Sequence, residues 1–240
     1  MKIRAINLRP LLKEMQLEKG KVYTFFGRPA IGKTHTAVEF TSYLWFDKQL
    51  RGVFLTRDSW EKLAESVVKW ESYHFICQTD AMKYLSEEEH YNFDKISKVV
   101  AEHKADFLVI DNVYPYRAEQ DEENLILHLK ELAQQHNVIV ICIAPQLVRF
   151  DMSGSPSELL QRAEKTPVAK ELIEQSDFVA FLDCWAYFNV SYEGHFNDSM
   201  DFIIAKGNYK PTVVNIKHFS EFKYPVGQFP ADSVNEWLNK

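Results

Sequence analysis

One stretch decides what fold this chain adopts: Gly27-Arg28-Pro29-Ala30-Ile31-Gly32-Lys33-Thr34, which matches the pattern G-x-x-x-x-G-K-[ST]. The apolar, β-rich run 21–26 precedes it, and Ala37, Phe40 and Leu44 follow it at helical spacing. A strand, a glycine-containing turn and a helix start are the setting in which backbone amides surround phosphate oxygens. The stretch is therefore predicted to be a phosphate-binding loop.

The residue types of this loop have physical reasons. Glycine lets the backbone curl so that its N–H groups point at phosphate oxygens, and the following helix adds the positive end of its dipole. Lys33 is expected to bridge the outer phosphates and the Thr34 hydroxyl to hold Mg²⁺. His35, next along the helix, is interpreted as a surface residue close to the nucleotide and not as a catalyst. The predicted nucleotide-binding residues are Gly27, Arg28, Pro29, Ala30, Ile31, Gly32, Lys33, Thr34 and His35.

A second acidic position completes the expected site. Residues 107–110 are all apolar and are followed by Asp111, as in a buried parallel strand that delivers its last residue to the crevice where ligands bind. We expect Asp111 to reach Mg²⁺ or its water from the strand beside the phosphate loop. The predicted ligand is a nucleoside triphosphate with Mg²⁺, and the predicted metal-binding residues are Thr34 and Asp111.

Length and composition bound the architecture. The chain has 240 residues, of which 46% are hydrophobic and 14% aromatic, enough for the core of one large α/β domain. We expect a single domain over 1–240. Its predicted parts are an N-terminal arm or lid at 1–20, a nucleotide-binding core at 20–183, a β-hairpin extension at 184–221 and a tail at 222–240.

Charge and cysteine content restrict partners and location. The formal net charge is −6, so nucleic-acid binding would require a local basic strip. The three cysteines form no close pair, which argues against a disulfide framework or a zinc site and fits a reducing interior. The N-terminus is charged throughout, and the longest apolar run, 138–144, is too short to span a bilayer. A soluble cytoplasmic protein without membrane contact is expected.

The order of elements predicts the fold class. Strand and helix patterns alternate up to about residue 182, and hairpin patterns follow. The expected fold is α/β, with a mainly parallel central sheet flanked by helices and extended by C-terminal antiparallel strands. Strands are predicted at 52–56, 75–76, 107–111, 138–143, 178–182, 185–190, 200–205 and 212–219. Helices are predicted at 34–44, 59–70, from the acidic run after Ser86 to about 103, 122–136, 170–175 and in a short segment from 233. Residues 150–166 are predicted to be a mobile surface loop.

These motifs, in order, resemble the ATPase domain of the DnaB-type replicative helicases within the RecA-like superfamily. The loop is similar to that family's Gly-x-Arg-Pro-x-x-Gly-Lys-Thr, including the Arg-Pro pair. The segment 144–149 looks like its Ser-Gln-Leu-Asn-Arg, residues 174–179 resemble its Glu-Gln-Asp-Ala-Asp segment, and 203–206 resemble the strand leading to its Lys-x-Arg finger. The resemblance covers about residues 20–219 and implies a RecA-like P-loop NTPase fold.

The resemblance also implies roles for single residues. Gln146 would sense the γ-phosphate and couple it to a DNA-facing loop, with Arg149 beside it. Lys206 would reach the nucleotide of a neighbouring subunit in a ring or filament. The resemblance thus implies ATP or ADP as the nucleotide, single-stranded DNA and further copies of the chain as partners, and replication or recombination as the process.

Three departures from the family pattern bear on activity. Where the family has Ser-Leu-Glu-Met with a catalytic glutamate, this chain has Leu55-Thr56-Arg57-Asp58-Ser59-Trp60, so Asp58 is the first substitute and Glu61 the second. Where the family has Lys-x-Arg, this chain reads Lys206-Gly207-Asn208, which leaves Lys210 as the alternative to the missing arginine. Only about twenty residues precede the first strand, so the family's N-terminal helical collar is expected to be absent.

Three functions therefore remain open at the level of sequence. The leading one is an ATPase of the helicase type, in which water positioned by Asp58 or Glu61 attacks the γ-phosphate sensed by Gln146, aided by Lys33 and Lys206. The second is a nucleotide-gated regulatory or assembly module with little hydrolysis and no helicase activity. A small-acceptor kinase is the third and weakest, because the segment at Gln146 and the later hairpins do not look like a kinase lid.

Overall fold

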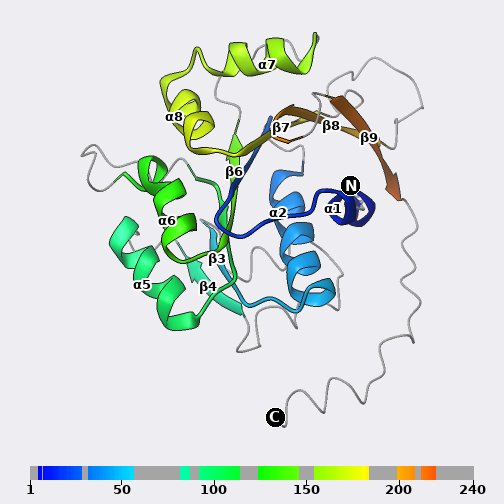
Figure 1. Ribbon diagram of the computed structural model, residues 1–240. Helices are drawn as coiled ribbons and strands as arrows, with labels where there is room; N and C mark the ends of the chain where they lie inside the picture. Colours follow the sequence, from blue (N-terminus) through cyan, green and yellow to red (C-terminus); the bar gives the residue numbers. More distant parts are fainter. Residues whose placement is uncertain are drawn as a thin grey trace, which may run out of the picture.

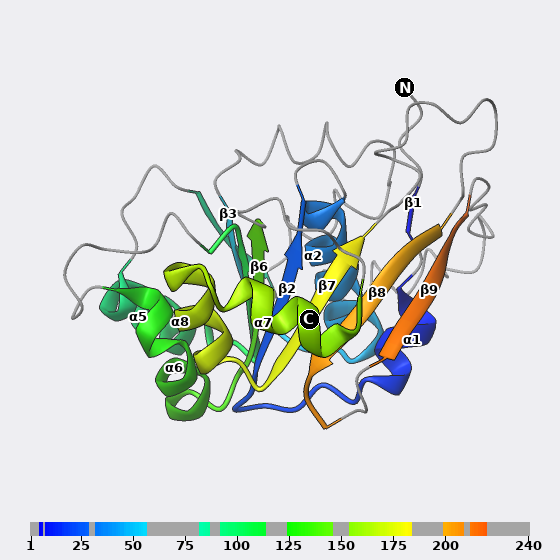
Figure 2. The same cartoon turned by 90° about the horizontal axis from the view of Figure 1, so that it is seen from above.

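The structure is a computed structural model, and it describes residues 5–6, 8–28, 32–56, 82–86, 92–113, 124–145, 154–183, 199–208 and 212–219. Their strands form one nine-stranded sheet in the order β1-β9-β8-β7-β2-β6-β5-β3-β4 (Figures 1 and 2). Within the described residues no helix has the length and apolarity needed to cross a bilayer. The observed class is the predicted one, a mainly parallel sheet with flanking helices and antiparallel strands near the C-terminus.

The parallel part of the sheet is built mainly from strands whose side chains are buried on both faces, and only the edge strand 82–86 exposes a charged residue, Lys83, among the described residues. Apolar runs without polar alternation produce this arrangement, because a parallel strand is covered by helices above and below. Their pairing is parallel throughout. The strands are β2 (Val22–Gly27), β3 (Gly52–Thr56), β4 (Met82–Ser86), β5 (Phe107–Asp111), β6 (Ile139–Pro145) and β7 (Phe178–Asp183).

Helices cover the two faces of this sheet and enclose two separate cores (Figure 1). One face carries α1 (Arg9–Glu14) and α2 (Lys33–Ser42), which continues as a π-helical turn, Tyr43–Asp47. The other face is covered by α5 (Phe93–His103), the 3-10 turn η4 (Leu125–His128), α6 (Leu129–Gln135), α7 (Pro156–Ala163) and α8 (Pro167–Gln175).

The strand order places the site. The chain leaves β2 towards α2 on one face, whereas α7 and α8, which follow β6, lie on the opposite face. Neighbouring strands whose connections diverge in this way form a switch point, where open α/β sheets bind ligands at the carboxyl ends of the strands. The loop after β2 lies at this point.

The antiparallel extension joins both ends of the described chain. Strand β8 (Ser199–Lys206) pairs with β7, and β9 (Thr212–Phe219) pairs with β8. The short β1 (Ala5–Ile6) then pairs with β9, so the N-terminal arm completes this edge of the sheet. The predicted strands at 200–205 and 212–219 are confirmed.

Three local predictions were wrong. Residues 150–166 contain helix α7, which starts with a capping box between Ser155 and Glu158 and has proline in its first turn. Helix α5 is capped by Asn92, whose side chain accepts a hydrogen bond from the Lys95 amide, whereas Ser86 belongs to the unpredicted strand β4. The helix predicted at 122–136 is a 3-10 turn followed by α6. The elements predicted at 59–70, 75–76, 185–190 and from 233 lie outside the described residues.

The N-terminal arm is an integral part of one core. Leu8, Leu12 and Met15 are almost fully buried against a cluster that includes Phe25, Phe40 and Phe202. Because α1 is only six residues long, it depends on this packing and not on its own helix propensity. This segment therefore packs on the body of its own chain.

Truncating Leu12 tests that packing. The Leu12→Ala variant is expected to lower the free energy of unfolding by about 2–5 kcal/mol, since it leaves a cavity in a closed core. Chemical denaturation measures the change. Lys13→Ala, on the exposed side of the same helix, is the matched control and should change stability by less than about 0.5 kcal/mol. Equal, small effects of the two variants would mean that the arm does not pack on the core in solution.

Candidate nucleotide-binding site

The phosphate loop extends from the most central strand of the sheet. Strand β2 lies between β6 and β7, with Gly27 in register with Pro145 on one side and Leu182 on the other. At the far end of the loop Gly32 caps α2 with a left-handed backbone, φ 94°, a conformation that strongly favours glycine. Its carbonyl accepts a 2.8 Å hydrogen bond from the Thr36 amide, so the helix begins immediately after the loop.

Lys33 is the first residue of α2 and folds back over the loop. Its ammonium donates a 2.8 Å hydrogen bond to the Arg28 carbonyl at the start of the loop. Burial lowers the pKa of Lys33 below its usual value, and the Asp111 carboxylate opposes that shift. The Lys33 side chain is thus held beside the start of the loop by a hydrogen bond to a neutral carbonyl. An anionic acceptor would bind the ammonium more strongly and could take the place of that carbonyl.

Asp111 ends strand β5 and is almost completely buried. Helix α2 packs against both β5 and β6, which brings the start of α2 and the carboxyl end of β5 to the same edge of the sheet. The peptide bond to Asn112 is cis, and the Val113 amide then donates to the Ile143 carbonyl of β6. One expectation needs correction: β5 is not beside the phosphate-loop strand, because β6 lies between them.

The remaining predicted residues divide into two groups. Thr34 is partly buried in the first turn of α2, and the backbone of His35 lies on the same helix. Outside the described residues lie Pro29, Ala30, Ile31, Asp58, Glu61, Gln146, Arg149 and Lys210. The structure therefore brings together Gly27, Arg28, Gly32, Lys33, Thr34 and Asp111.

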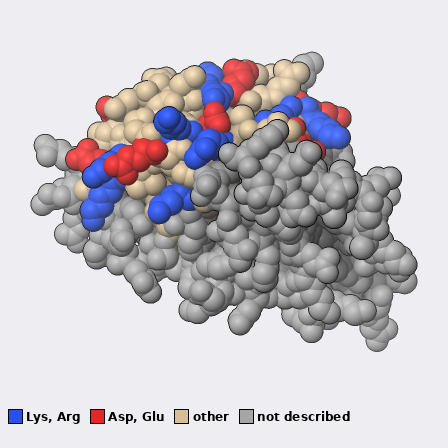
Figure 3. All heavy atoms as spheres, turned by 90° about the horizontal axis from the view of Figure 1, so that it is seen from below, with Lys and Arg blue, Asp and Glu red and all other residues tan. Residues whose placement is uncertain are grey.

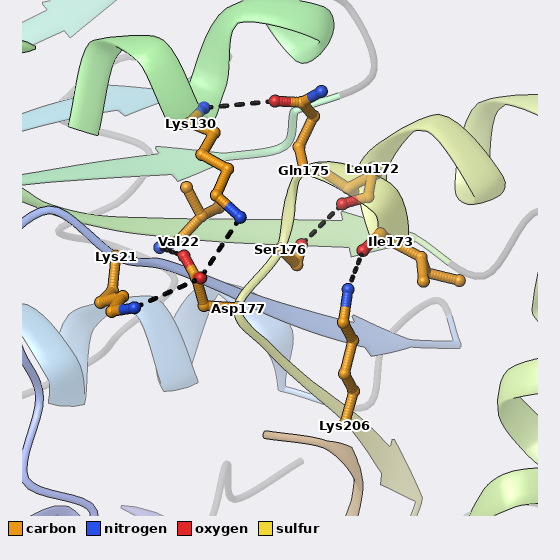
Figure 4. A network of polar contacts seen from close by, with 9 residues as sticks. All are labelled: Lys21, Val22, Lys130, Leu172, Ile173, Gln175, Ser176, Asp177 and Lys206. Atoms are coloured by element: carbon orange, nitrogen blue, oxygen red, sulfur yellow. Dashed lines mark hydrogen bonds and ion pairs between the residues drawn. The ribbon is translucent and has the colours of Figure 1, made fainter. Parts of the chain in front are cut away.

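Lys206 lies at the opposite end of the sheet. It is in register with Val179, near the start of β7, whereas the phosphate loop follows the end of β2. Its ammonium donates a 2.8 Å hydrogen bond to the Ile173 carbonyl near the end of α8 (Figure 4). Burial lowers the pKa of Lys206, and the nearby ammonium of Lys130 lowers it further. Lys206 cannot reach the nucleotide site of its own chain from this position.

Asp177 organises the surroundings of Lys206. Its carboxylate accepts a 3.0 Å hydrogen bond from the Val22 amide and lies 3.6 Å from the Lys21 ammonium and 3.5 Å from that of Lys130 (Figure 4). These contacts fix the connection before β7 to the start of β2. They give this end of the sheet a structural function in the isolated chain.

The sequence patterns missed one residue near the loop. Asp183 is the last residue of β7, and its carboxylate is 4.0 Å from the Arg28 guanidinium. Its side chain is only 10% exposed, which is rare for an aspartate outside an ion pair. The only sequence signal was an acidic residue after a buried strand, the same signal that identified Asp111.

Known proteins resemble this chain in structure and not in sequence. No protein-family model matches the sequence, and no curated protein sequence matches it. The structure does match solved ones. A DnaB-like replicative helicase, described with its interactions with primase, superposes with a TM-score of 0.63 at 15% sequence identity, over 85% of this chain and 57% of that chain. This chain has a RecA-like fold.

A second solved structure supports the same conclusion. A KaiC-like protein from the hyperthermophilic archaeon Pyrococcus horikoshii superposes with a TM-score of 0.59 at 16% identity, over 84% of this chain and 90% of that one. The likeness to DnaB-type and KaiC-like domains is one of fold, since identity is low in both cases. The chain spans little more than half the length of the replicative helicase that it matches.

Removing the acidic partner of Lys33 tests the electrostatics of this site. In Asp111→Asn the carboxylate that raises the pKa of Lys33 is gone while burial remains, so the pKa of Lys33 should fall further. A pH titration of the Lys33 side chain by NMR measures the change. Asp177→Asn, at the other end of the sheet, is the control and should leave the titration unaltered. A Lys33 pKa that does not fall in Asp111→Asn would show that the two groups are not close.

Proposed function

We propose that this protein binds ATP with Mg²⁺ and hydrolyses it as a RecA-like ATPase of the helicase type. The observation that carries the proposal is the convergence of Lys33 and Asp111 at the switch point of the sheet, where burial and the acidic neighbour both act on the lysine. A cation from the loop and a buried carboxylate beyond it are what a nucleotide phosphate chain with its metal requires.

The described residues fit such a ligand. Gly32 in a left-handed conformation opens α2. The N–H groups in the first turn of a helix have no partner within the helix and can face an anion, and the helix dipole favours negative charge there. Lys33 would exchange its bond to the Arg28 carbonyl for a phosphate oxygen, which is the stronger, charge-assisted acceptor. For Lys33, receiving a nucleotide would thus be a change of hydrogen-bond partner.

Mg²⁺ would be held by the Thr34 hydroxyl and, directly or through water, by Asp111. When bound, the ion would neutralise charge on the outer phosphates. The burial of Asp111 keeps its carboxylate close to its position at the end of β5. For hydrolysis, Asp58 or Glu61 would orient the attacking water, and Gln146, following β6, would sense the terminal phosphate.

Single-stranded DNA and a ring or filament of several copies belong to this proposal. Lys206 supports it because, at the end of the sheet opposite its own phosphate loop, it could act only on the nucleotide of another copy. On the described part of the face in Figure 3, Lys and Arg side chains are interspersed with Asp and Glu. DNA contact would therefore need a local basic strip elsewhere on the assembly.

A second candidate function is a nucleotide-gated assembly module with little hydrolysis. The position of Lys206 favours it, since this ammonium is bonded within its own chain to the Ile173 carbonyl. Asn208 stands where the resembled family has its finger arginine, a group that contributes about 10³–10⁵ to rate in phosphoryl-transfer enzymes that use one. Without such a group, nucleotide exchange and not turnover would change the state of the protein.

Turnover measurements separate the two functions. The wild-type chain with ATP and Mg²⁺ is expected to release phosphate, faster with single-stranded DNA. In Lys33→Ala the rate should fall about 10²–10³-fold, as when one preorganised donor to a developing charge is removed. Lys98→Ala, an exposed lysine on α5, is the control and should match wild type.

Each outcome identifies a function. Absence of phosphate release with and without DNA would reject the ATPase. Nucleotide binding without release, together with a nucleotide-dependent change of oligomeric state in sedimentation, would select the assembly module. If neither binding nor release depended on Lys33, both proposals would fail.

A further inference from the structure

The end of β7 forms a side support for the phosphate loop. Strands β2 and β7 are parallel, and Gly27 is in register with Leu182. One residue further along each strand, Arg28 and Asp183 are therefore neighbours. Their charged groups are 4.0 Å apart, and the two side chains are 25% and 10% exposed, respectively. A charge pair so little exposed is screened much less by salt and water than one on the surface.

Side-chain alternation shows which way this pair points. On β2, Phe26 belongs to the core under α5–α8, and on β7 the same is true of Phe181. Because side chains two residues apart on a strand share a face, Arg28 and Asp183 point to that side of the sheet. Helix α2, which carries Lys33, lies on the other side. Arg28 therefore extends away from the phosphates that its own loop would surround.

A second carboxylate explains why a cation is required here. Asp201 on β8 is directly opposite Asp183 in the antiparallel pair. Like charges in that position repel each other and destabilise the pairing. Arg28 contributes positive charge beside this acidic pair, so the arginine and the ends of β7 and β8 hold one another in place.

The backbone of Arg28 links this support to the site. Its carbonyl accepts the 2.8 Å hydrogen bond from the Lys33 ammonium. Arg28 is thus paired through its side chain with Asp183 and bonded through its backbone carbonyl to Lys33, the proposed phosphate-binding lysine. A shift of Arg28 would move both the start of the loop and the resting position of Lys33.

We propose that Asp183 is a positioning residue: through Arg28 it holds the phosphate loop in the shape that receives a nucleotide. This inference rests on the proposed nucleotide binding and assigns Arg28 an anchoring task and not a direct contact with phosphate. It predicts a sign. If Asp183 acted only as a negative charge near the phosphates, removing that charge would strengthen ATP binding. If it positions the loop, removing it weakens binding although the repulsion is reduced.

Binding of ATP and Mg²⁺ to four proteins tests the proposal: wild type, Asp183→Asn, Lys33→Ala and Asp177→Asn. Asp183→Asn keeps the size of the side chain and is expected to raise the Kd for ATP about tenfold, the effect of a small misplacement of a binding group. Asp177→Asn is the control, a partly buried aspartate (20% exposed, against 10% for Asp183) at the opposite end of β7 that also pairs with cations. It should leave the Kd within about twofold of wild type.

A double variant shows whether Asp183 acts through Arg28. Arg28→Gln alone should weaken binding by about the same factor, and Arg28→Gln combined with Asp183→Asn should be no worse than either single change. Restoring the carboxylate as Asp183→Glu should recover part of the affinity. If the two single effects on the Kd multiplied in the double variant, Asp183 and Arg28 would act independently, and the proposed link between them would be overturned.

Hydrogen exchange without nucleotide gives a readout independent of the proposed function. Peptides that cover residues 27–34 should exchange faster in Asp183→Asn than in wild type or Asp177→Asn, because the loop loses its lateral anchor. Unchanged exchange there overturns the inference whatever the chain binds. If Lys33→Ala abolishes ATP binding while Asp183→Asn binds as well as or better than wild type, nucleotide binding stands and the positioning role of Asp183 falls.

Discussion

The structure depends on the complete burial of β2. Every residue of this strand is enclosed between β6 and β7 and under helices on both faces. Aromatic contacts extend from it in both directions: the rings of Phe25 and Phe40 are 4.6 Å apart on the α2 side, and those of Phe26 and Phe181 are 5.5 Å apart on the other. The loop that follows such a strand starts from a fixed point in a close-packed interior.

That constraint divides the sheet into two ends with different properties. At the carboxyl end, Gly32 and the start of α2 follow β2 in the sequence and present polar backbone groups. At the opposite end, carboxylates tie the connections together: Asp177 holds the approach to β2, and Asp106 accepts hydrogen bonds from the Lys19 ammonium and the Arg51 amide. Pairs this exposed contribute about 1 kcal/mol or less each, so they maintain register while the two cores supply the stability.

Fold and function stand on different observations. The two solved RecA-like structures share only 15% and 16% of their residues with this chain, so very different sequences form the same fold. The proposed nucleotide chemistry rests instead on the site, where Lys33 follows Gly32 and senses the charge of Asp111. The resemblance in the loop supports the proposed nucleotide binding. The departure at Asn208 argues against fast hydrolysis of that nucleotide.

The sequence by itself determined the buried strands, β3 and β5 to the residue, because apolar runs directly report burial on both faces, and it predicted the loop pattern at 27–34. It also contained the capping box of α7, although the surrounding polar residues favoured a loop. Only the tertiary structure decided that β6 separates β5 from β2, that Asp183 comes to lie beside Arg28, and that Lys206 lies at the far end of the sheet. These are matters of which strand pairs with which. Parallel pairing joins segments separated by long crossovers, so no local pattern specifies the neighbour.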